Sequence, residues 1–243
     1  MKKIGFIGAF DKSNFIIYVA KLLELLGYKI LVVDATSGQK IKYIVPSINP
    51  TKAYITDFEN IDFAVGFESW KDIEKYLGVR FDTNLEDEIE DQINKEKNET
   101  KVSYDYVLLD VDESEKIESF DINNIENNYF VTSFDIYSLR KGVSILKGFN
   151  DTKLTKILFS YETSKEDEIY LNHMTMEYKI EWNEYTIYFQ IFGEDNIVFE
   201  ENQRLEKIRY RRLSQNYKDS LAYVVQDIDK KQNLGSIKKL MKE

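Results

Sequence analysis

The fold of this chain is decided by MKKIGFIGAFDKSNFIIYVAKLLELLGYKILVVDAT, residues Met1–Thr36. This stretch holds two apolar runs, Lys2–Phe10 and Lys29–Asp34, and between them an amphipathic segment, Phe15–Leu26, that ends at Gly27. Strands that do not alternate apolar and polar residues are covered on both faces, as in parallel strand–helix–strand units. The stretch therefore predicts an α/β fold with a parallel sheet.

The polar turn between the first run and the helix is the expected ligand site. Ligands of parallel sheets bind at the carboxyl ends of the strands and over helix amino ends. The candidate phosphate-binding residues in this turn are Gly8, Asp11, Lys12, Ser13 and Asn14. A purely structural interpretation also fits, in which Asp11 or Ser13 accepts hydrogen bonds from the first free N–H groups of the helix.

The same residues resemble the opening of the ParA/MinD branch of P-loop ATPases. In that family a glycine-rich loop follows the first strand, the helix ends in a "GK" turn, and the second strand ends in Asp. The corresponding residues here are Leu26–Lys29 and Leu31–Thr36. The resemblance implies one three-layer domain over residues 1–228, with a mostly parallel twisted sheet between helices.

The phosphate loop departs from the family pattern. The family has two glycines in the middle of the loop, another before the invariant Lys, and a second signature Lys, where this chain has Ala9, Phe10, Asp11 and only Lys12. Phe10 cannot readily take the positive φ that lets successive N–H groups converge on an anion. At about 4 Å, Asp11 and a phosphate would repel by about 4 kcal/mol. We therefore predict a degenerate Walker A loop, as in TadZ-like or MinD-like regulators.

The strands of the resemblance recur along most of the chain. We expect strands over Tyr104–Asp110, Asn128–Ser133, Leu154–Ser160 and Tyr185–Phe192, a pair of short strands over Ala53–Thr56 and Asp62–Phe67, and helices over Ser69–Leu77, Phe134–Leu146, Glu166–Tyr178 and Tyr217–Ile228. After the last of these strands, Gly193–Asn196 stands where the family has a turn. The resemblance gives Asp34 and Asp110, at two strand ends, a role near Mg²⁺, whereas the structural alternative is a buried strand followed by a helix cap.

Two functional hypotheses follow from the resemblance. In the first, the chain has no catalytic residues and no cofactor, does not hydrolyse ATP, and acts as a dimeric adaptor or positioning factor for a membrane-associated pilus, secretion or division machine. In the second, it is a slow Mg-ATP-dependent ATPase that uses Lys12 as the phosphate lysine. Ser13 would then supply the Mg²⁺ hydroxyl, and Asp34 and Asp110 the carboxylates.

Composition narrows the class of protein. The 243 residues are 43% hydrophobic, which is enough for a large core, and no Cys is present, which excludes disulfides and thiolate metal sites. We expect no secretory signal at the start of the chain, and no apolar run of the sequence approaches the length of a membrane span. We therefore expect a cytoplasmic protein, and the net charge of −10 argues against a nucleic-acid partner.

Two charged segments and a lone His leave alternatives open. Residues 82–99 are strongly acidic and predict a solvated helix, with a metal site as the alternative. Arg204–Arg212 is the basic cluster, which predicts either a solvated helix face balanced by nearby glutamates, or an anion, DNA or partner surface. His173 has no nucleophile or ligand set beside it, and we expect it to be structural or exposed.

The last residues, 229–243, read as a polar linker and a short basic amphipathic tail. Its apolar face holds Leu234, Ile237, Leu240 and Met241, and its basic face includes Lys238 and Lys239. Membrane-bound MinD proteins end in a similar segment, so a weak membrane contact at the inner face of the membrane is one expectation. The alternative is a frayed terminal helix.

Overall fold

The computed structural model describes residues 1–46, 53–82, 103–125, 127–162 and 165–242, and its centre is an eight-stranded sheet in the order β3-β4-β2-β5-β1-β6-β7-β8. The strands are β1 (Lys2–Ile7), β2 (Ile30–Asp34), β3 (Tyr54–Phe58), β4 (Ile61–Val65), β5 (Tyr106–Val111), β6 (Asn127–Ser133), β7 (Thr152–Ser160) and β8 (Ile180–Gln190). All neighbouring strands pair in parallel except β3, which forms an antiparallel hairpin with β4. The predicted α/β fold with a mostly parallel sheet is confirmed.

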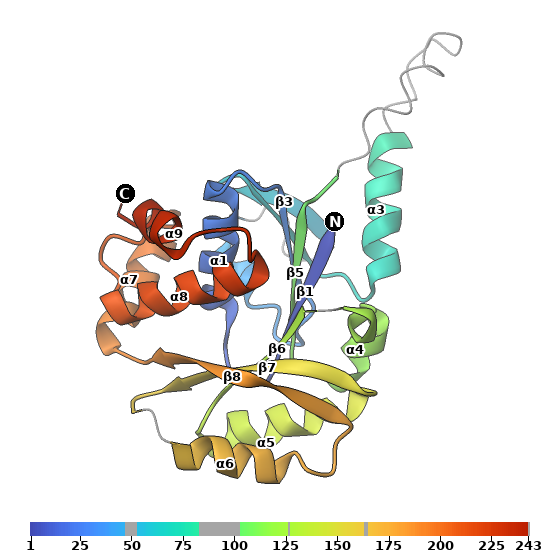
Figure 1. Cartoon of the computed structure of the whole chain (residues 1–243). Coiled ribbons are helices and arrows are strands. Elements are labelled where there is room, and N and C mark those ends of the chain that lie inside the picture. Colours follow the sequence, from blue (N-terminus) through green and yellow to red (C-terminus); the bar gives the residue numbers. More distant parts are fainter. Residues whose placement is uncertain (47–52, 83–102, 126, 163–164, 243) are drawn as a thin grey trace, which may run out of the picture.

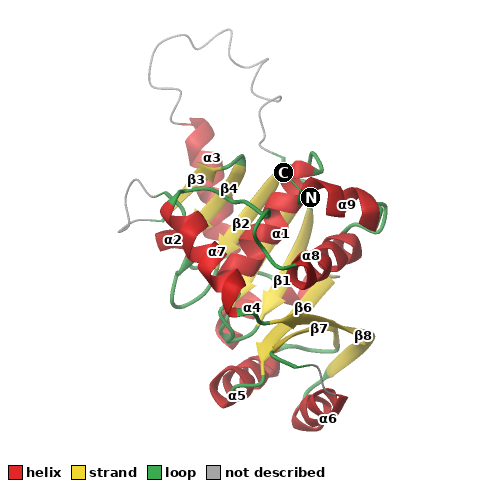
Figure 2. Ribbon diagram, turned by 90° about the vertical axis from the view of Figure 1, so that its left-hand side faces the viewer, coloured by secondary structure: helices red, strands yellow, loops and turns green. Residues whose placement is uncertain are grey.

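Helices cover both faces of the sheet and give three layers (Figures 1 and 2). They are α1 (Ser13–Leu25), α2 (Ile41–Ile44), α3 (Trp70–Asp82), α4 (Ser114–Ser119), α5 (Ile136–Ile145), α6 (Lys165–Met174), α7 (Gly193–Arg204), α8 (Gln215–Ile228) and α9 (Leu234–Leu240). One hydrophobic cluster joins the sheet to α1, α7, α8 and α9, and a second joins it to α3, α4, α5 and α6. Both faces of the central strands are thus buried, which is why their sequences do not alternate.

Three expectations about local structure need correction. The helix predicted to end before Gly78 continues to Asp82, since one glycine in a helix costs only about 1 kcal/mol. Gly193–Asn196 is the first turn of α7 and not a free turn. The basic cluster from Arg204 onward lies mostly in the loop between α7 and α8 and not on a helix face.

The structure describes the basic cluster and His173, but almost nothing of the acidic segment. In the basic cluster, Arg204 pairs with Glu200 and Arg212 with Glu201, in line with the balanced interpretation. His173 is exposed on α6. The acidic segment lies outside the described residues, apart from its first residue at the end of α3.

In this structure the residues of the predicted tail lie against the domain. Their helix, α9, packs against α8 and α1, and Ile237 and Met241 are 0% and 1% exposed. The apolar face that could have met a membrane is therefore covered by the core of the domain. Lys239 and Lys242 are exposed, whereas Lys238 forms an ion pair with Asp219 of α8 at 2.9 Å. None of the helices in the described part of the chain is both long and apolar enough to cross a bilayer.

The start of α5 shows how the sequence fixes a helix boundary. Asp135 caps this helix: its Oδ1 accepts a hydrogen bond from the Ser138 amide at 2.9 Å, and its other oxygen accepts one from the Ser133 hydroxyl. The Asp135 side chain thus satisfies a free amide of the first turn.

Replacing Asp135 with alanine is expected to lower the free energy of unfolding by about 1 kcal/mol, because the free amides of α5 lose their acceptor. Urea denaturation measures this change. The matched control is Glu113→Ala, since Glu113 precedes α4 and makes no side-chain capping bond. Equal losses in the two variants would show that the Asp135 cap contributes nothing specific.

Candidate functional site

The candidate site lies where β1, β2 and β5 end and α1 begins. Asp34 of β2 pairs in register with Asp110 of β5, and Asp110 pairs with Phe6 of β1. The carboxyl ends of parallel strands meet at one edge of a sheet, and the loop Gly8–Lys12 crosses this edge to reach α1. The fold therefore brings the two predicted carboxylates and the predicted loop together.

Gly8, the first residue of the loop, is held between two neighbouring strands. Its φ of +147° lies in the range that side-chain-bearing residues rarely adopt. A Cβ at this position would lie 2.0 Å from the carbonyl oxygen of Val131, and the Gly8 amide donates to the Val111 carbonyl at 3.0 Å. Close packing against β5 and β6 alone is therefore enough to require glycine here.

The loop is closed by the side chain of Lys12. Its Nζ lies 2.6 Å from Asp110 Oδ1 and donates to the carbonyl oxygen of Gly8 at 2.7 Å. The Lys12 and Asp110 side chains are only 1% and 2% exposed. Lys12 thus bends back over its own loop and forms a buried ion pair with the end of β5.

Burial controls the ionisation of Asp110. Burial is the largest effect and raises the pKa of this carboxyl, the Lys12 ammonium lowers it, and the neighbouring Asp34 carboxylate raises it; together these effects give a pKa of about 7. The charged form of Asp110 in the folded protein therefore depends on Lys12 remaining in place.

A carboxylate of the chain itself lies at the amino end of α1. Asp11 Oδ1 accepts the Ser13 amide at 3.2 Å, and the other carboxylate oxygen forms an ion pair with Lys40. Burial alone would raise the pKa of Asp11, but Lys40 and the Ser13 amide more than offset this and hold the pKa below its usual value. An anionic group thus already occupies the position at which the helix amino end favours negative charge.

The remaining predicted residues also have partners within the chain. Asp34 Oδ1 accepts the amide and hydroxyl of Thr36 at 3.1 and 2.6 Å, and its Oδ2 accepts the Ile41 amide at 2.9 Å. Burial raises the pKa of Asp34 against these hydrogen bonds. Asp34 therefore acts as a cap for the turn that leads into α2.

The other two predicted residues lie at the start of α1. Asn14 Oδ1 accepts a hydrogen bond from the Gln203 side chain at 2.8 Å, and Ser13 is buried, with 4% exposure.

Among the described residues, no three His, Asp or Glu side chains lie close enough together to hold a metal ion. Asp34 and Asp110 are partners in the strand register, and the positive charge of Lys12 lowers the pKa of both carboxyls against the effect of burial. The carboxylates of the site thus face a side chain of the protein.

A pocket of about 320 Å³ lies beside the loop, between α1 and the ends of β7 and β8. Phe10 forms one wall and stacks on Phe159, with ring centroids 4.6 Å apart and an interplanar angle of 26°. Residues lining the pocket include Asp11, Asn14, Tyr161, Gln190, Phe192 and Asn196. The pocket falls at the small end of the size range typical of ligand sites.

Sequence reasoning missed the partners of these residues. It did not identify Lys40 as the counter-ion of Asp11, Thr36 as the partner of Asp34, or Phe159 as the ring that Phe10 stacks on. One signal in the sequence could have indicated the partner of Asp34. The turn after β2 is rich in Thr, Ser and Gln, whose side chains form hydrogen bonds with neighbouring groups of the chain.

Solved structures with the same fold are known, although no protein-family model and no curated protein sequence matches this chain. A variant of McdA from Cyanothece in complex with ATP is 12% identical, covers 93% of this chain and 95% of its own, and has a TM-score of 0.54. A Borrelia burgdorferi B31 protein bound to AMPPNP, described as a plasmid partition protein, is 12% identical, with coverages of 95% and 99% and a TM-score of 0.52. A ParA family ATPase from Chlorobium tepidum is 13% identical, with coverages of 100% and 98% and a TM-score of 0.48.

At these identities the likeness concerns the fold. The single domain shares with the McdA structure and the Borrelia burgdorferi structure a fold in which helices cover both faces of a mostly parallel sheet. Function has to be argued from the site itself.

Proposed function

We propose that this chain is a degenerate ParA/MinD-like protein that does not hydrolyse ATP and that acts through contacts with other proteins. The observation that carries the proposal is the buried ion pair of Lys12 with Asp110, which closes the loop over itself. In a working phosphate loop the lysine reaches the phosphates of the nucleotide. Here that lysine stabilises the folded chain.

The length of the loop supports the proposal. Only Ala9, Phe10 and Asp11 separate Gly8 from Lys12. The pattern G-x-x-x-x-G-K-[ST] is longer and has a second glycine, and its backbone N–H groups encircle a phosphate. The short loop with a stacked Phe10 ring does not fit a triphosphate.

Electrostatics supports it as well. The Asp11 carboxylate holds the Ser13 amide and is paired with Lys40, so a phosphate would have to displace a charge that is already neutralised. It would also have to separate Lys12 from a buried carboxylate. Breaking a buried pair in this way costs about 3–5 kcal/mol, which a triphosphate would have to recover through a loop with few free donors.

If the loop does not bind a nucleotide, the surface of the domain is the part of the protein that can act, through contacts with other proteins. As the family resemblance implies, we propose a homodimer that serves as an adaptor or positioning factor for a membrane-associated assembly such as a pilus, secretion or division apparatus. Because the apolar face of α9 is covered, we propose that a partner protein, and not this helix, provides contact with the inner face of the membrane.

One observation favours the alternative, a slow Mg-ATP-dependent ATPase. The pocket beside Phe10 opens next to the loop and has aromatic walls and polar groups, so a flat base could enter it. In that case Lys12 would leave Asp110 to reach the phosphates, while Ser13, Asp34 and Asp110 would be the groups available to Mg²⁺.

Phosphate release from millimolar Mg-ATP tests the proposal. We expect the wild-type rate to equal the rate in buffer, and Lys12→Met and Asp110→Asn to leave it unchanged, because no step depends on these residues. Turnover above the buffer rate that is lost in Lys12→Met would contradict the proposal and favour the ATPase. Circular dichroism of each variant confirms that it is folded.

A further inference from the structure

Helices α5 and α6 gather exposed apolar side chains on one face of the domain. They connect the parallel strands β6, β7 and β8, so they lie in one layer and run in the same direction. Figures 1 and 2 show this layer on the side of the sheet opposite α7, α8 and α9. Five large apolar side chains in α5, in α6 and just after α6 are between 48% and 76% exposed: Ile136, Tyr137, Ile169, Tyr170 and Met176. Apolar side chains that gather on one face indicate a site of contact with another protein.

The α5 half of this surface is basic. Residues 136–147, which are α5 and the turn after it, hold three basic side chains and no acidic one: Arg140, Lys141 and Lys147. In the described part of the chain no ion pair includes any of the three. The Lys141 ammonium lies 5.8 Å from the centre of the Tyr137 ring, and Lys147 attracts Glu115 of α4 from beyond ion-pair distance. The positive charges of α5 can therefore pair with carboxylates of another molecule.

The α6 half is acidic. Residues 166–177, which are most of α6 and the turn after it, hold four acidic side chains and no Lys or Arg: Glu166, Asp167, Glu168 and Glu177. Glu168 is bound within the chain by the Tyr188 hydroxyl. The two lysines that flank the range, Lys165 and Lys179, are fewer than the acidic side chains, so this half keeps a negative charge. The basic range and the acidic range together form the α5–α6 face.

We propose that the α5–α6 face binds a second copy of this chain, about a twofold axis that runs between α5 and α6 along their length. A twofold dimer uses the same surface of both copies, so this surface has to be complementary to itself. The proposed axis places the basic α5 of each copy against the acidic α6 of the other. A twofold axis across the helices would instead place α5 against α5 and bring like charges together. The charge pattern therefore selects both the occupant and the arrangement.

The inference gives the proposed homodimer a surface. It rests on that part of the proposed function, but it does not depend on whether the loop after β1 binds a nucleotide. The five apolar side chains leave water in the contact and favour association, while the charges fix the orientation of the two copies. The net charge of −10 opposes the contact only weakly, because the Debye length at physiological salt is about 8 Å and exposed charges farther apart are screened.

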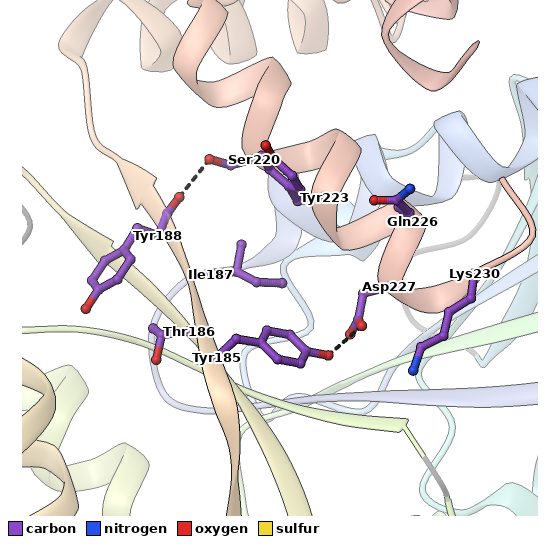
Figure 3. Close-up of a pocket in the computed structure, with 9 residues that line it drawn as sticks. All are labelled: Tyr185, Thr186, Ile187, Tyr188, Ser220, Tyr223, Gln226, Asp227 and Lys230. Atoms are coloured by element: carbon purple, nitrogen blue, oxygen red, sulfur yellow. Dashed lines mark hydrogen bonds between the residues drawn. The ribbon is translucent and has the colours of Figure 1, made fainter. Parts of the chain in front are cut away.

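A groove on the other side of the sheet provides a comparison surface (Figure 3). It has a volume of about 570 Å³, lies between β8 and α8, and is lined by Tyr223 of α8, which is 51% exposed. At one end of the groove the Tyr185 hydroxyl donates to Asp227. At the other end the Ser220 hydroxyl donates to the Tyr188 carbonyl at 2.7 Å. A contact through α5 and α6 leaves this groove uncovered.

Tyr137→Ala and Tyr223→Ala form a matched pair. Both tyrosines are exposed on helices, and each has a lysine ammonium over its ring, Lys141 at 5.8 Å and Lys238 at 5.7 Å from the ring centre. The two variants thus lose similar contacts within the chain. We expect Tyr137→Ala to raise the dissociation constant of the dimer at least about tenfold, as for a tyrosine in the middle of an interface, and Tyr223→Ala to leave it unchanged. Sedimentation velocity over a range of concentrations measures the constant.

Charge reversal tests the arrangement of the two copies. Two triple variants each reverse one half of the face: Arg140→Glu, Lys141→Glu and Lys147→Glu in the acidic variant, and Glu166→Lys, Asp167→Lys and Glu177→Lys in the basic variant. Each variant alone should be monomeric, because its face then meets its copy with charges of one sign. An equal mixture, with a fluorescent label on one variant, should form a one-to-one dimer. Both variants keep a negative net charge, so overall attraction cannot produce this dimer.

Three results would overturn the proposal. A wild-type chain that stays monomeric at every concentration would remove this contact together with the proposed homodimer. A dimer that both triple variants still form would keep the proposed homodimer and place it on another surface. Monomeric variants whose mixture does not associate would show that the face does not pair with its own copy. Circular dichroism of each variant confirms that it is folded.

Discussion

Replacing Lys12 with alanine is expected to lower the free energy of unfolding by about 3–5 kcal/mol. The variant leaves the Asp110 carboxylate, whose side chain is 2% exposed, without its ammonium partner. The donor to the Gly8 carbonyl is lost as well. Urea denaturation of the wild type and the variant, followed by far-ultraviolet circular dichroism, measures the difference.

The loss should depend on pH in a defined direction. Burial raises the pKa of Asp110 to about 7, so the folded protein holds this proton more tightly than the unfolded chain does. Such a group adds stability below the ordinary carboxyl pKa of about 4, and this contribution disappears as the pH rises through the folded-state value. Without Lys12 the pKa of Asp110 rises further, so the deficit should be small at pH 5 and full at pH 9.

A double variant separates the ion pair from simple loss of packing. Lys12→Met combined with Asp110→Leu removes both charges and keeps most of the volume. Such replacements of a buried pair are often neutral or stabilising. We expect it to recover most of the stability lost in Lys12→Ala. A deficit that is absent, or that does not change with pH, would show that Lys12 is not the structural partner of Asp110.

Gly8→Ala is expected to cost about 4 kcal/mol, because backbone strain at positive φ and overpacking each contribute about 1–3 kcal/mol. The added Cβ would lie 2.0 Å from the Val131 carbonyl oxygen, which belongs to the backbone of β6 and cannot rotate away. Thermal unfolding and urea denaturation measure the loss.

The matched control is Gly193→Ala. Gly193 begins α7, and no atom lies within 4 Å of a Cβ placed there, so alanine should be neutral or slightly stabilising. If both substitutions had the same small effect, Gly8 would not be a packing residue, and its glycine would have to be explained by a ligand.

The sequence was informative where burial determines structure. The apolar runs Lys2–Phe10 and Lys29–Asp34 predicted β1 and β2, because strands covered on both faces need no polar residues. The strand–helix–strand unit at the start of the chain placed the loop correctly at the edge of the sheet.

The contacts that define the site could not be predicted in this way. A Lys in a turn has many accessible rotamers, and only the folded sheet shows that Asp110 of β5 is the acceptor for Lys12. The same holds for Lys40 beside Asp11. The α9 pattern shows that one face is apolar, but it cannot show whether lipid or protein covers that face.

Calorimetric titration of the full chain with ATP and Mg²⁺ tests the central claim most directly, namely that its own side chains have closed the phosphate loop. We predict no binding heat at millimolar nucleotide, for the wild type and for Lys12→Met alike. Micromolar binding that Lys12→Met abolishes would contradict the account, because Lys12 would then be available to phosphate and not committed to Asp110.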